Sequence, residues 1–336
     1  MSITLTKTPP AIKKTTNSIQ DFQEMGFREF RQLYSGEQSR SSWNDVYTGS
    51  NEKGYGEACR QVQNKHGILL GVVGGIDPVF SLIASQKPDL ALLNDINPDS
   101  VDYLYYRGML TQVCCTPCEY VSRVLGVPLD EKEFNKMSYN ELRDAVIYAR
   151  SATTTIAEED EPMLSKIKEL NAETLEKLKS VTPDEQHKLI ERVFKEHGPS
   201  KIEPTGFLIS ALDERVNQNK GWLMSQQSYD SVKGAWAQGK IKAFEGDFME
   251  QSFKVARYVL SKTDAQKVSS VYFSNILDAQ AEIPTFWMRN MRLSRICDNN
   301  TKIVYSSVKN SGSVLIPTYV IDYEHLTRGG RFKVAD

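Results

Sequence analysis

The residues with the clearest chemical potential end two apolar runs in the first third of the chain. Gly71, Gly74 and Gly75 lie in or just after the run Ile68–Val73, and Asp95 ends the next run. A glycine turn lets a ligand approach the backbone, and an acid about 20 residues further on can accept hydrogen bonds from both ribose hydroxyls of a nucleoside. The spacing therefore predicts a nucleoside site.

The glycine spacing narrows the choice of nucleoside. A dinucleotide fold uses G-x-G-x-x-G, because its pyrophosphate must approach backbone amides at a helix N-terminus. The glycines here do not match that pattern, and Asp77 beside the turn would repel an anion. S-adenosylmethionine (SAM) carries no phosphate and suits a loop of negative character. A structural alternative stays open, in which the glycines form only a tight turn and Asp95 only caps a helix.

These residues must be positioned by a strand, turn, helix, strand unit. Ile68–Val73 and Leu90–Leu93 are short, β-branched or leucine-rich runs typical of buried parallel strands. Asp77-Pro78 predicts an N-cap and a proline at the first position of a helix that begins at Val79, and Asn97-Pro98 repeats the device. Such a βαβ unit brings the polar groups to the carboxyl ends of its strands.

The rest of the chain completes an α/β fold. Further strands are expected at Ile241–Glu245, Val268–Phe273, Lys302–Ser307 and Ser313–Asp322, the last at an edge or bulge because it contains Pro317. From 116 to 222 the patterns predict helices, one of them opened by a capping box at Thr182. We therefore expect a Rossmann-like, mostly parallel sheet with helices on both faces and a helical insertion. The expected parts are an N-terminal arm and helix (1–55), the first half of the core (56–115), the insertion (116–222), the second half of the core (223–322) and a tail (323–336).

Composition limits the partners. A net charge of −2 gives no reason to expect nucleic acid or an anionic membrane surface. The most apolar window, Gly67–Ala84, contains Asp77 and Pro78 and is too short for a membrane span. Without an apolar leader, and with an odd number of cysteines, five, the chain is expected in the cytoplasm, although export by a route that reads other signals stays open. No metal is predicted, because Cys114-Cys115-x-x-Cys118 lacks a full set of zinc ligands.

Four strand ends read GVVGG, NDIN, EGDF and FSNI in chain order. They resemble the serial motifs of class I SAM-dependent methyltransferases, and more specifically an uncharacterised bacterial family with such a core, a helical insertion and an HGP element, here His197 to Pro199. The resemblance implies that Ser274 and Asn275 face the reacting methyl group. It implies cofactor contacts from Gly71, Gly74, Gly75, Asp95, Asn97, Asp247, Phe248 and Ser274.

The sequence departs from the methyltransferase pattern in two places. Leu69 and Leu70 stand where the family carries an acid before its glycine loop, and we expect Asp77 to compensate from the far side of the loop. The N/D-P-P-Y signature of nitrogen methylation is absent at 274–277. The second departure leaves the acceptor open between a small molecule and a protein.

Methyl transfer from a sulfonium is an in-line displacement that depends mainly on positioning, and it needs a base only when the acceptor loses a proton. Asn275 is the expected residue for orienting an acceptor, and His197 is the candidate base. His197 has a structural alternative, since a histidine at a helix end commonly interacts with the last carbonyls.

Three functions remain in competition. The first is a SAM-binding methyltransferase. The second is a methyltransferase-like module that has lost catalysis and serves in binding or interaction, such as a delivered bacterial effector. The third, a nicotinamide-dependent oxidoreductase, is disfavoured by the missing phosphate loop.

Overall fold

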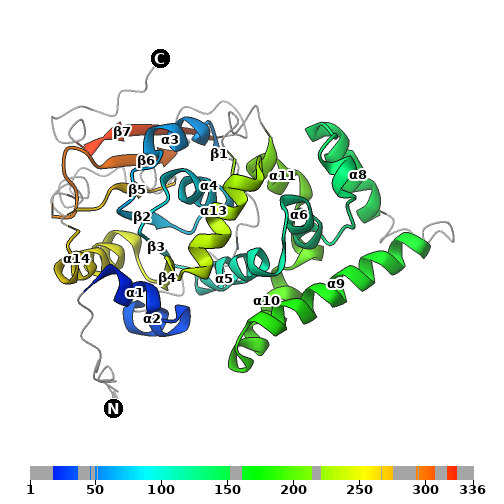
Figure 1. Ribbon diagram of the computed structural model, residues 1–336, viewed down its shortest axis with the longest axis horizontal. Coiled ribbons are helices and arrows are strands. Elements are labelled where there is room, and N and C mark those ends of the chain that lie inside the picture. Colours follow the sequence, from blue (N-terminus) through cyan, green and yellow to red (C-terminus); the bar gives the residue numbers. More distant parts are fainter. Residues whose placement is uncertain are drawn as a thin grey trace, which may run out of the picture.

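The computed structural model describes residues 18–36, 46, 50, 52–151, 161–213, 221–265, 267–274, 293, 295–306 and 316–323. These residues form an α/β fold around one mostly parallel sheet with the strand order β1-β7-β6-β5-β2-β3-β4 (Figure 1). The order of the central strands reverses between β2 and β5, as in Rossmann-like sheets. The expected fold class is confirmed at this level.

The strands are β1 (Glu52–Lys53), β2 (Ile68–Val72), β3 (Leu90–Asp95), β4 (Ile241–Glu245), β5 (Ser270–Tyr272), β6 (Lys302–Ser306) and β7 (Ile316–Asp322). The neighbours from β4 to β6 pair in parallel, and β7 pairs antiparallel with β6. All five residues of β2 are buried, because helices cover both faces of the sheet. Pro317, expected at an edge or bulge, lies beyond the pairing of β7 with β6, which covers Thr318 to Asp322. It pairs with Lys53 of the short β1, which the sequence did not predict.

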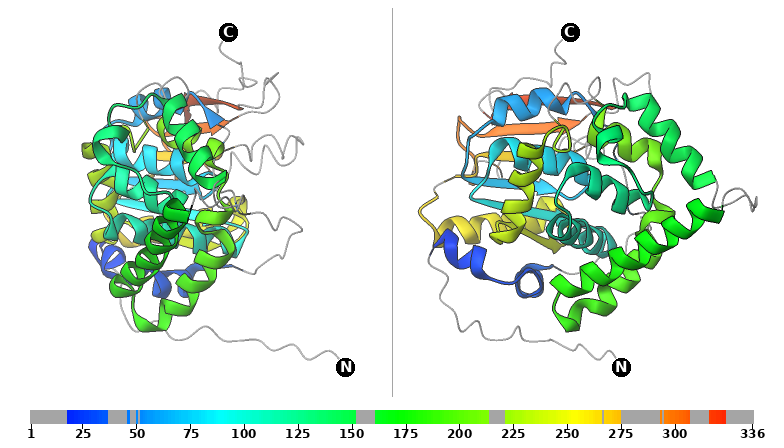
Figure 2. Two further views of the ribbon diagram at one scale, coloured as in Figure 1. Left: turned by 90° about the vertical axis from the view of Figure 1, so that its right-hand side faces the viewer. Right: turned by 45° about the vertical axis from the view of Figure 1, so that its right-hand side comes forward.

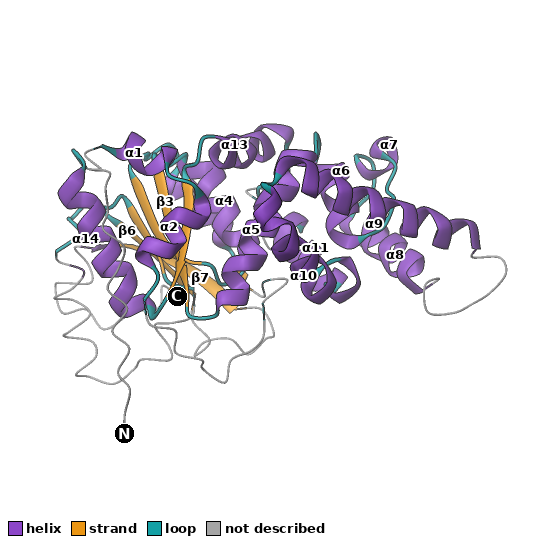
Figure 3. Ribbon diagram, turned by 90° about the horizontal axis from the view of Figure 1, so that it is seen from below, coloured by secondary structure: helices purple, strands orange, loops and turns teal. Residues whose placement is uncertain are grey.

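The helices, with three short 3₁₀ or π turns, are α1 (Ile19–Glu24), α2 (Phe27–Tyr34), α3 (Tyr55–Val62), α4 (Ile76–Gln86), α5 (Pro98–Val113), α6 (Pro117–Leu125), α7 (Glu131–Phe134), α8 (Tyr139–Ser151), α9 (Glu161–Val181), η2 (Asp184–Gln186), α10 (His187–His197), η3 (Pro199–Lys201), α11 (Pro204–Leu212), α13 (Gln226–Ala237), η4 (Phe248–Ser252) and α14 (Phe253–Lys262). Figure 3 shows α4, α5 and α13 on one side of the sheet and α14 on the other. None of the helices in the described ranges is long and apolar enough to cross a membrane.

Helix starts test the capping predictions. Asn97 caps α5 as expected, since its Oδ1 accepts from the Asp99 amide at 2.9 Å with Pro98 at the first position. The capping box at Thr182 is wrong, because its hydroxyl donates back to the Leu178 carbonyl at 2.9 Å and α10 begins only at His187. The N-cap assigned to Asp77 is also wrong. Gly75 occupies that position in extended conformation, so α4 begins before the aspartate.

The insertion consists of α6 to α11, which gather on one side of the sheet beyond α5 (Figures 1 and 2). The buried carboxylate of Asp77 on α4 joins it to the core. Arg107 on α5 donates to Asp77 Oδ1 at 2.9 Å, and both side chains are at most 1% exposed. Ser210 on α11 and the indole of Trp222 donate to the same carboxylate at 3.1 Å each. The insertion is therefore anchored directly behind the turn that follows β2.

A chain of charges forms a second connection. Arg31 on α2 bridges Glu245 at the end of β4 to Asp102 on α5, and Asp102 also accepts from Arg192 on α10. Arg192 in turn donates to Asp99 in the first turn of α5, at 2.7 Å. Because the Glu245 and Asp102 side chains are only 3% and 5% exposed, their charges depend on these guanidinium groups.

Candidate ligand site at the carboxyl ends of β2, β3 and β5

The sheet has its topological switch point between β2 and β5, which pair directly through Gly71 and Tyr272. In an open α/β sheet, ligands bind outside the carboxyl ends of the strands at such a point. The segments that meet there follow β2, β3 and β5, and they carry Gly74, Asp95 and Ser274. These are three of the residues predicted from the sequence.

Asp95 links the segments that follow β2 and β3. Its carboxylate accepts from the Asn97 amide at 2.9 Å and from the amides of Gly74 and Ile96, with the Ser100 hydroxyl as a further donor. Removal from water raises the pKa of Asp95 to about 6, and these hydrogen bonds oppose the rise. The residue as a whole is half-buried.

The glycine turn faces Ser274. Gly74 has a φ of +39°, and a Cβ placed on it would lie 3.6 Å from the Ser274 hydroxyl oxygen. A Cβ on Gly75 would lie 2.5 Å from the Cβ of Ser50. The turn is thus held between Asp95 on one side and the Ser50 and Ser274 segments on the other. Gly71, by contrast, lies within β2 and packs on Leu93 and Tyr272, so it shapes the sheet rather than the turn.

Glu52 is a buried acid that the sequence analysis did not select. Its carboxylate accepts from the Tyr272 hydroxyl and from the Ser274 hydroxyl at 2.5 Å each, with Ser306 as a third hydroxyl partner. The residue is 3% exposed, and burial raises its pKa while the three hydroxyl groups oppose the rise. Within the described part of the chain, no cationic side chain contacts Glu52.

The end of β4 adds a third acid. Asp247 is exposed and caps the π turn η4 through an accepted bond from the Glu250 amide at 3.0 Å. Phe248 is buried, and its ring packs on Phe273 at a centroid distance of 5.3 Å. This contact ties the end of β4 to the end of β5. A π turn at this position is a recurrent feature of functional sites.

The remaining predicted residues lie elsewhere or are already engaged. The Asp77 carboxylate accepts hydrogen bonds from Arg107, Ser210 and Trp222 in the core. Contrary to the expectation, Asp77 therefore does not take the place of the acid that is missing before the glycine loop. Asn97 uses its side chain to cap α5. His197 ends α10 and packs edge-on against Tyr103, where burial lowers its pKa. No contact within the described ranges joins His197 to the strand ends, and Asn275 lies outside the described residues.

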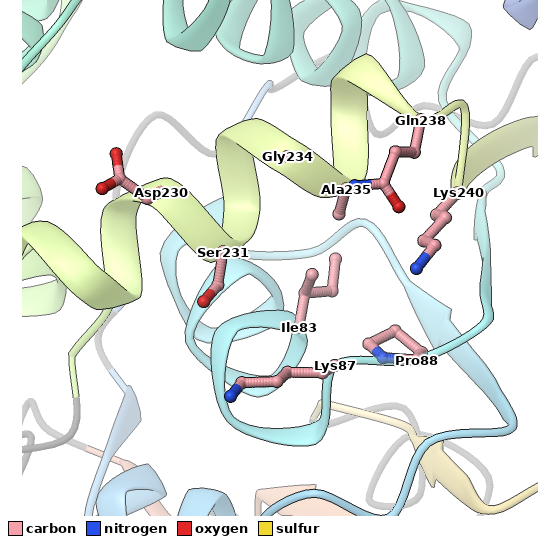
Figure 4. Close-up of a pocket in the computed structure, with 9 residues that line it drawn as sticks. All are labelled: Ile83, Lys87, Pro88, Asp230, Ser231, Gly234, Ala235, Gln238 and Lys240. Carbon is pink, nitrogen blue, oxygen red and sulfur yellow. The ribbon is translucent and has the colours of Figure 1, made fainter.

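Cavities occur at other places in the fold. A cavity of about 200 Å³ lies between α4 and α13, where Pro88 and Lys240 precede β3 and β4 (Figure 4). It is therefore at the amino ends of the strands. A cavity of about 700 Å³ lies between the insertion and the start of α13, and one of about 240 Å³ lies beside Arg31 and Asp102. None of these three includes Gly74, Asp95 or Glu52.

Glu52 could not be selected from its local sequence. It lies in a polar stretch shortly before Gly54, where a surface loop is the default interpretation. Only its pairing with β7 and the approach of Ser50 to Gly75 place it over the sheet, and both contacts are distant in sequence. Burial of its carboxyl could not be derived from local pattern.

Comparison with known proteins gives a family without an assigned activity. No curated protein matches the chain. One family matches residues 149–323, which begin within α8 and end directly after β7. This segment covers slightly more than half of the chain, and it carries Asp247 and Ser274 but not Gly74 or Asp95. On this match, the chain belongs to the family described as "Domain of unknown function (DUF7790)".

Proposed function

We propose that this protein binds SAM at the switch point and transfers its methyl group to a small-molecule or protein acceptor. The observation that carries the proposal is the contact of the glycine turn with Asp95 on one side and Ser274 on the other. The Gly74 amide donates to Asp95, while its side-chain position faces Ser274. A nucleoside whose ribose hydroxyls lie at Asp95 would place its 5′ substituent over that turn.

The charge of the site supports SAM over a dinucleotide. Asp95 at the end of β3, Asp247 after β4, and Glu52, which contacts Ser274 after β5, place three carboxyl groups at the carboxyl ends of these strands. A pyrophosphate would be repelled there, whereas a sulfonium and an ammonium group are attracted. The turn also lacks the glycine spacing that presents amides to phosphates.

Titration calorimetry and thermal unfolding with SAM, S-adenosylhomocysteine (SAH) and NAD test the proposal. A ligand at about 100 times its dissociation constant stabilises the fold by roughly 2.7 kcal/mol. We expect stabilisation by SAM or SAH and none by NAD. Stabilisation by NAD alone, or by none of the three, contradicts the proposal.

Asp95→Ala identifies the site. We expect at least a tenfold rise, roughly, in the dissociation constant of SAM, because two ribose hydroxyls lose a charged acceptor. Asp89→Ala is the matched control. Asp89 precedes the amino end of β3 and accepts from the Gly67 amide at 2.9 Å, so it plays a similar backbone role away from the site. Equal SAM affinity in wild type and Asp95→Ala would show that the assignment of the ribose site is wrong.

A non-catalytic SAM-binding module is the second candidate. It is favoured by the occupied carboxylate of Asp77, which leaves the glycine loop without the expected compensating acid. Incubation of the protein with labelled SAM and acceptor mixtures separates the two candidates. Formation of SAH at a rate above the protein-free control supports the enzyme, and tight binding without turnover supports the module.

A further inference from the structure

Among the described residues, the buried carboxyl groups of Asp77, Asp102 and Glu245 have guanidinium partners, and Glu52 does not. Asp77 is paired with Arg107, and Glu245 is paired with Arg31. Glu52 is buried to the same degree but is held, among the described residues, by the hydroxyl groups of Tyr272, Ser274 and Ser306. A buried carboxylate without a cation is unfavourable unless a positive charge reaches it in the functional state.

Glu52 is connected to the glycine turn through Ser274. The Ser274 hydroxyl that donates to Glu52 also lies 3.6 Å from the position of a Cβ on Gly74, which is an ordinary van der Waals distance. Gly74 donates to Asp95 on its other side. One residue therefore separates the proposed ribose position from the hydroxyl shell of Glu52.

We infer that Glu52 is the counter-ion of the sulfonium group of SAM. This inference rests on the proposed function. In SAM the sulfur is bonded to the ribose C5′, so its positive charge is the first one met on leaving the ribose. The α-ammonium group lies at the far end of the methionine chain. With the ribose at Asp95, the sulfonium is the cation that lies nearest Gly74 and Ser274.

The consequence is discrimination by charge rather than by shape. SAH has the same adenosine and amino-acid parts but a neutral sulfur. We expect the wild-type protein to bind SAM at least about tenfold more tightly than SAH. The aza analogue of SAM, which carries a protonated tertiary amine in place of the sulfonium, is expected to bind like SAM. These three titrations use the wild-type protein and need no variant.

Glu52→Gln tests the residue. It keeps the size and removes the charge; its amide oxygen can still accept from one of the hydroxyl groups of Tyr272 and Ser274, and the other must accept from its NH2 group. The SAM to SAH affinity ratio is expected to fall to within about twofold of unity, mainly through weaker SAM binding. The matched control is Glu245→Gln. Glu245 is a buried carboxyl at the end of β4, and Arg31 already balances its charge. It is expected to change both affinities by the same factor.

The outcomes separate this inference from the proposed function. Binding of none of the three ligands to wild type contradicts the proposed function and removes the inference with it. Equal wild-type affinities for SAM, the aza analogue and SAH overturn the inference alone. An unchanged SAM to SAH ratio in Glu52→Gln also overturns it, and so does an equal loss of both ligands, because that result would assign Glu52 to the ammonium group.

Discussion

Asp77 and Glu52 flank the same glycine turn and are almost equally buried, yet their surroundings differ. Asp77 lies behind the turn, with Arg107, Ser210 and Trp222 around its carboxylate. Glu52 lies over the strand ends with hydroxyl donors and, in the described residues, no cation. The first carboxylate is complete inside the protein. The second has a stable form only when it is protonated or when a positive charge is brought to it.

The two carboxylates cannot be told apart by burial, but their partners indicate a structural role for Asp77 and a role in ligand binding for Glu52. A balanced carboxylate fixes the insertion to the core, so its loss should appear as unfolding. An unbalanced carboxylate at a strand end should affect stability less and ligand choice more. Asp95 belongs to the second class, because backbone amides hold its carboxyl group and no guanidinium of the described residues contacts it.

The largest effect is expected at the balanced pair. Arg107→Met leaves Asp77 buried without its cation and should lower the free energy of unfolding by about 3–5 kcal/mol in urea denaturation. The double variant with Asp77→Leu should recover most of that loss, since neither charge remains. A loss below about 1 kcal/mol in the single variant would show that Asp77 is not held as a charge and would break the comparison.

The next effect is a pH dependence at Asp95. Its pKa is raised from 3.8 to about 6, so between these values the folded protein binds a proton that the unfolded chain has released. Stability from this group is therefore present at low pH and lost as the pH rises toward 6. The stability of wild type relative to Asp95→Asn should fall by up to about 3 kcal/mol between pH 4 and pH 7. A flat difference across this range would contradict a raised pKa.

The smallest effect concerns the turn itself. In Gly75→Ala the new methyl group would lie 2.5 Å from the Cβ of Ser50, so the segment that leads to Glu52 must move. We expect a loss of about 1–3 kcal/mol in unfolding free energy together with weaker SAM binding. Gly234→Ala is the control, because Gly234 lies within α13 and its nearest neighbour would be at 3.7 Å. That change should stabilise the fold by up to about 1 kcal/mol.

The sequence was sufficient where local physics decides the structure. The central strands are buried on both faces, so their apolar runs stand out, and β4 was predicted with its observed bounds. Asn97-Pro98 fixed the start of α5 because both the side-chain acceptor and the proline act within one turn. Asp95 could be placed at a strand end because it ends a buried apolar run.

Prediction failed where distant contacts decide. Asp77-Pro78 has the composition of a cap, but the extended backbone of Gly75 starts α4 earlier and turns the aspartate toward Arg107. Glu52 becomes part of the site only because the two-residue strand β1 pairs with β7, which is distant in the sequence. His197 was selected by its type and its position at a helix end before Gly198, whereas its ring packs against a tyrosine of α5.

The position of β2 and β3 in the sheet has a consequence for the family match. The matched segment, 149–323, contains β4 to β7 but neither β2 nor β3. In the sheet, β4 pairs with β3, and β2 joins β3 to β5. In the matched segment alone, β4 would be separated from β5 by the two positions that β2 and β3 occupy in the sheet. The matched segment therefore lacks the centre of the sheet, which this chain builds from residues upstream of the match.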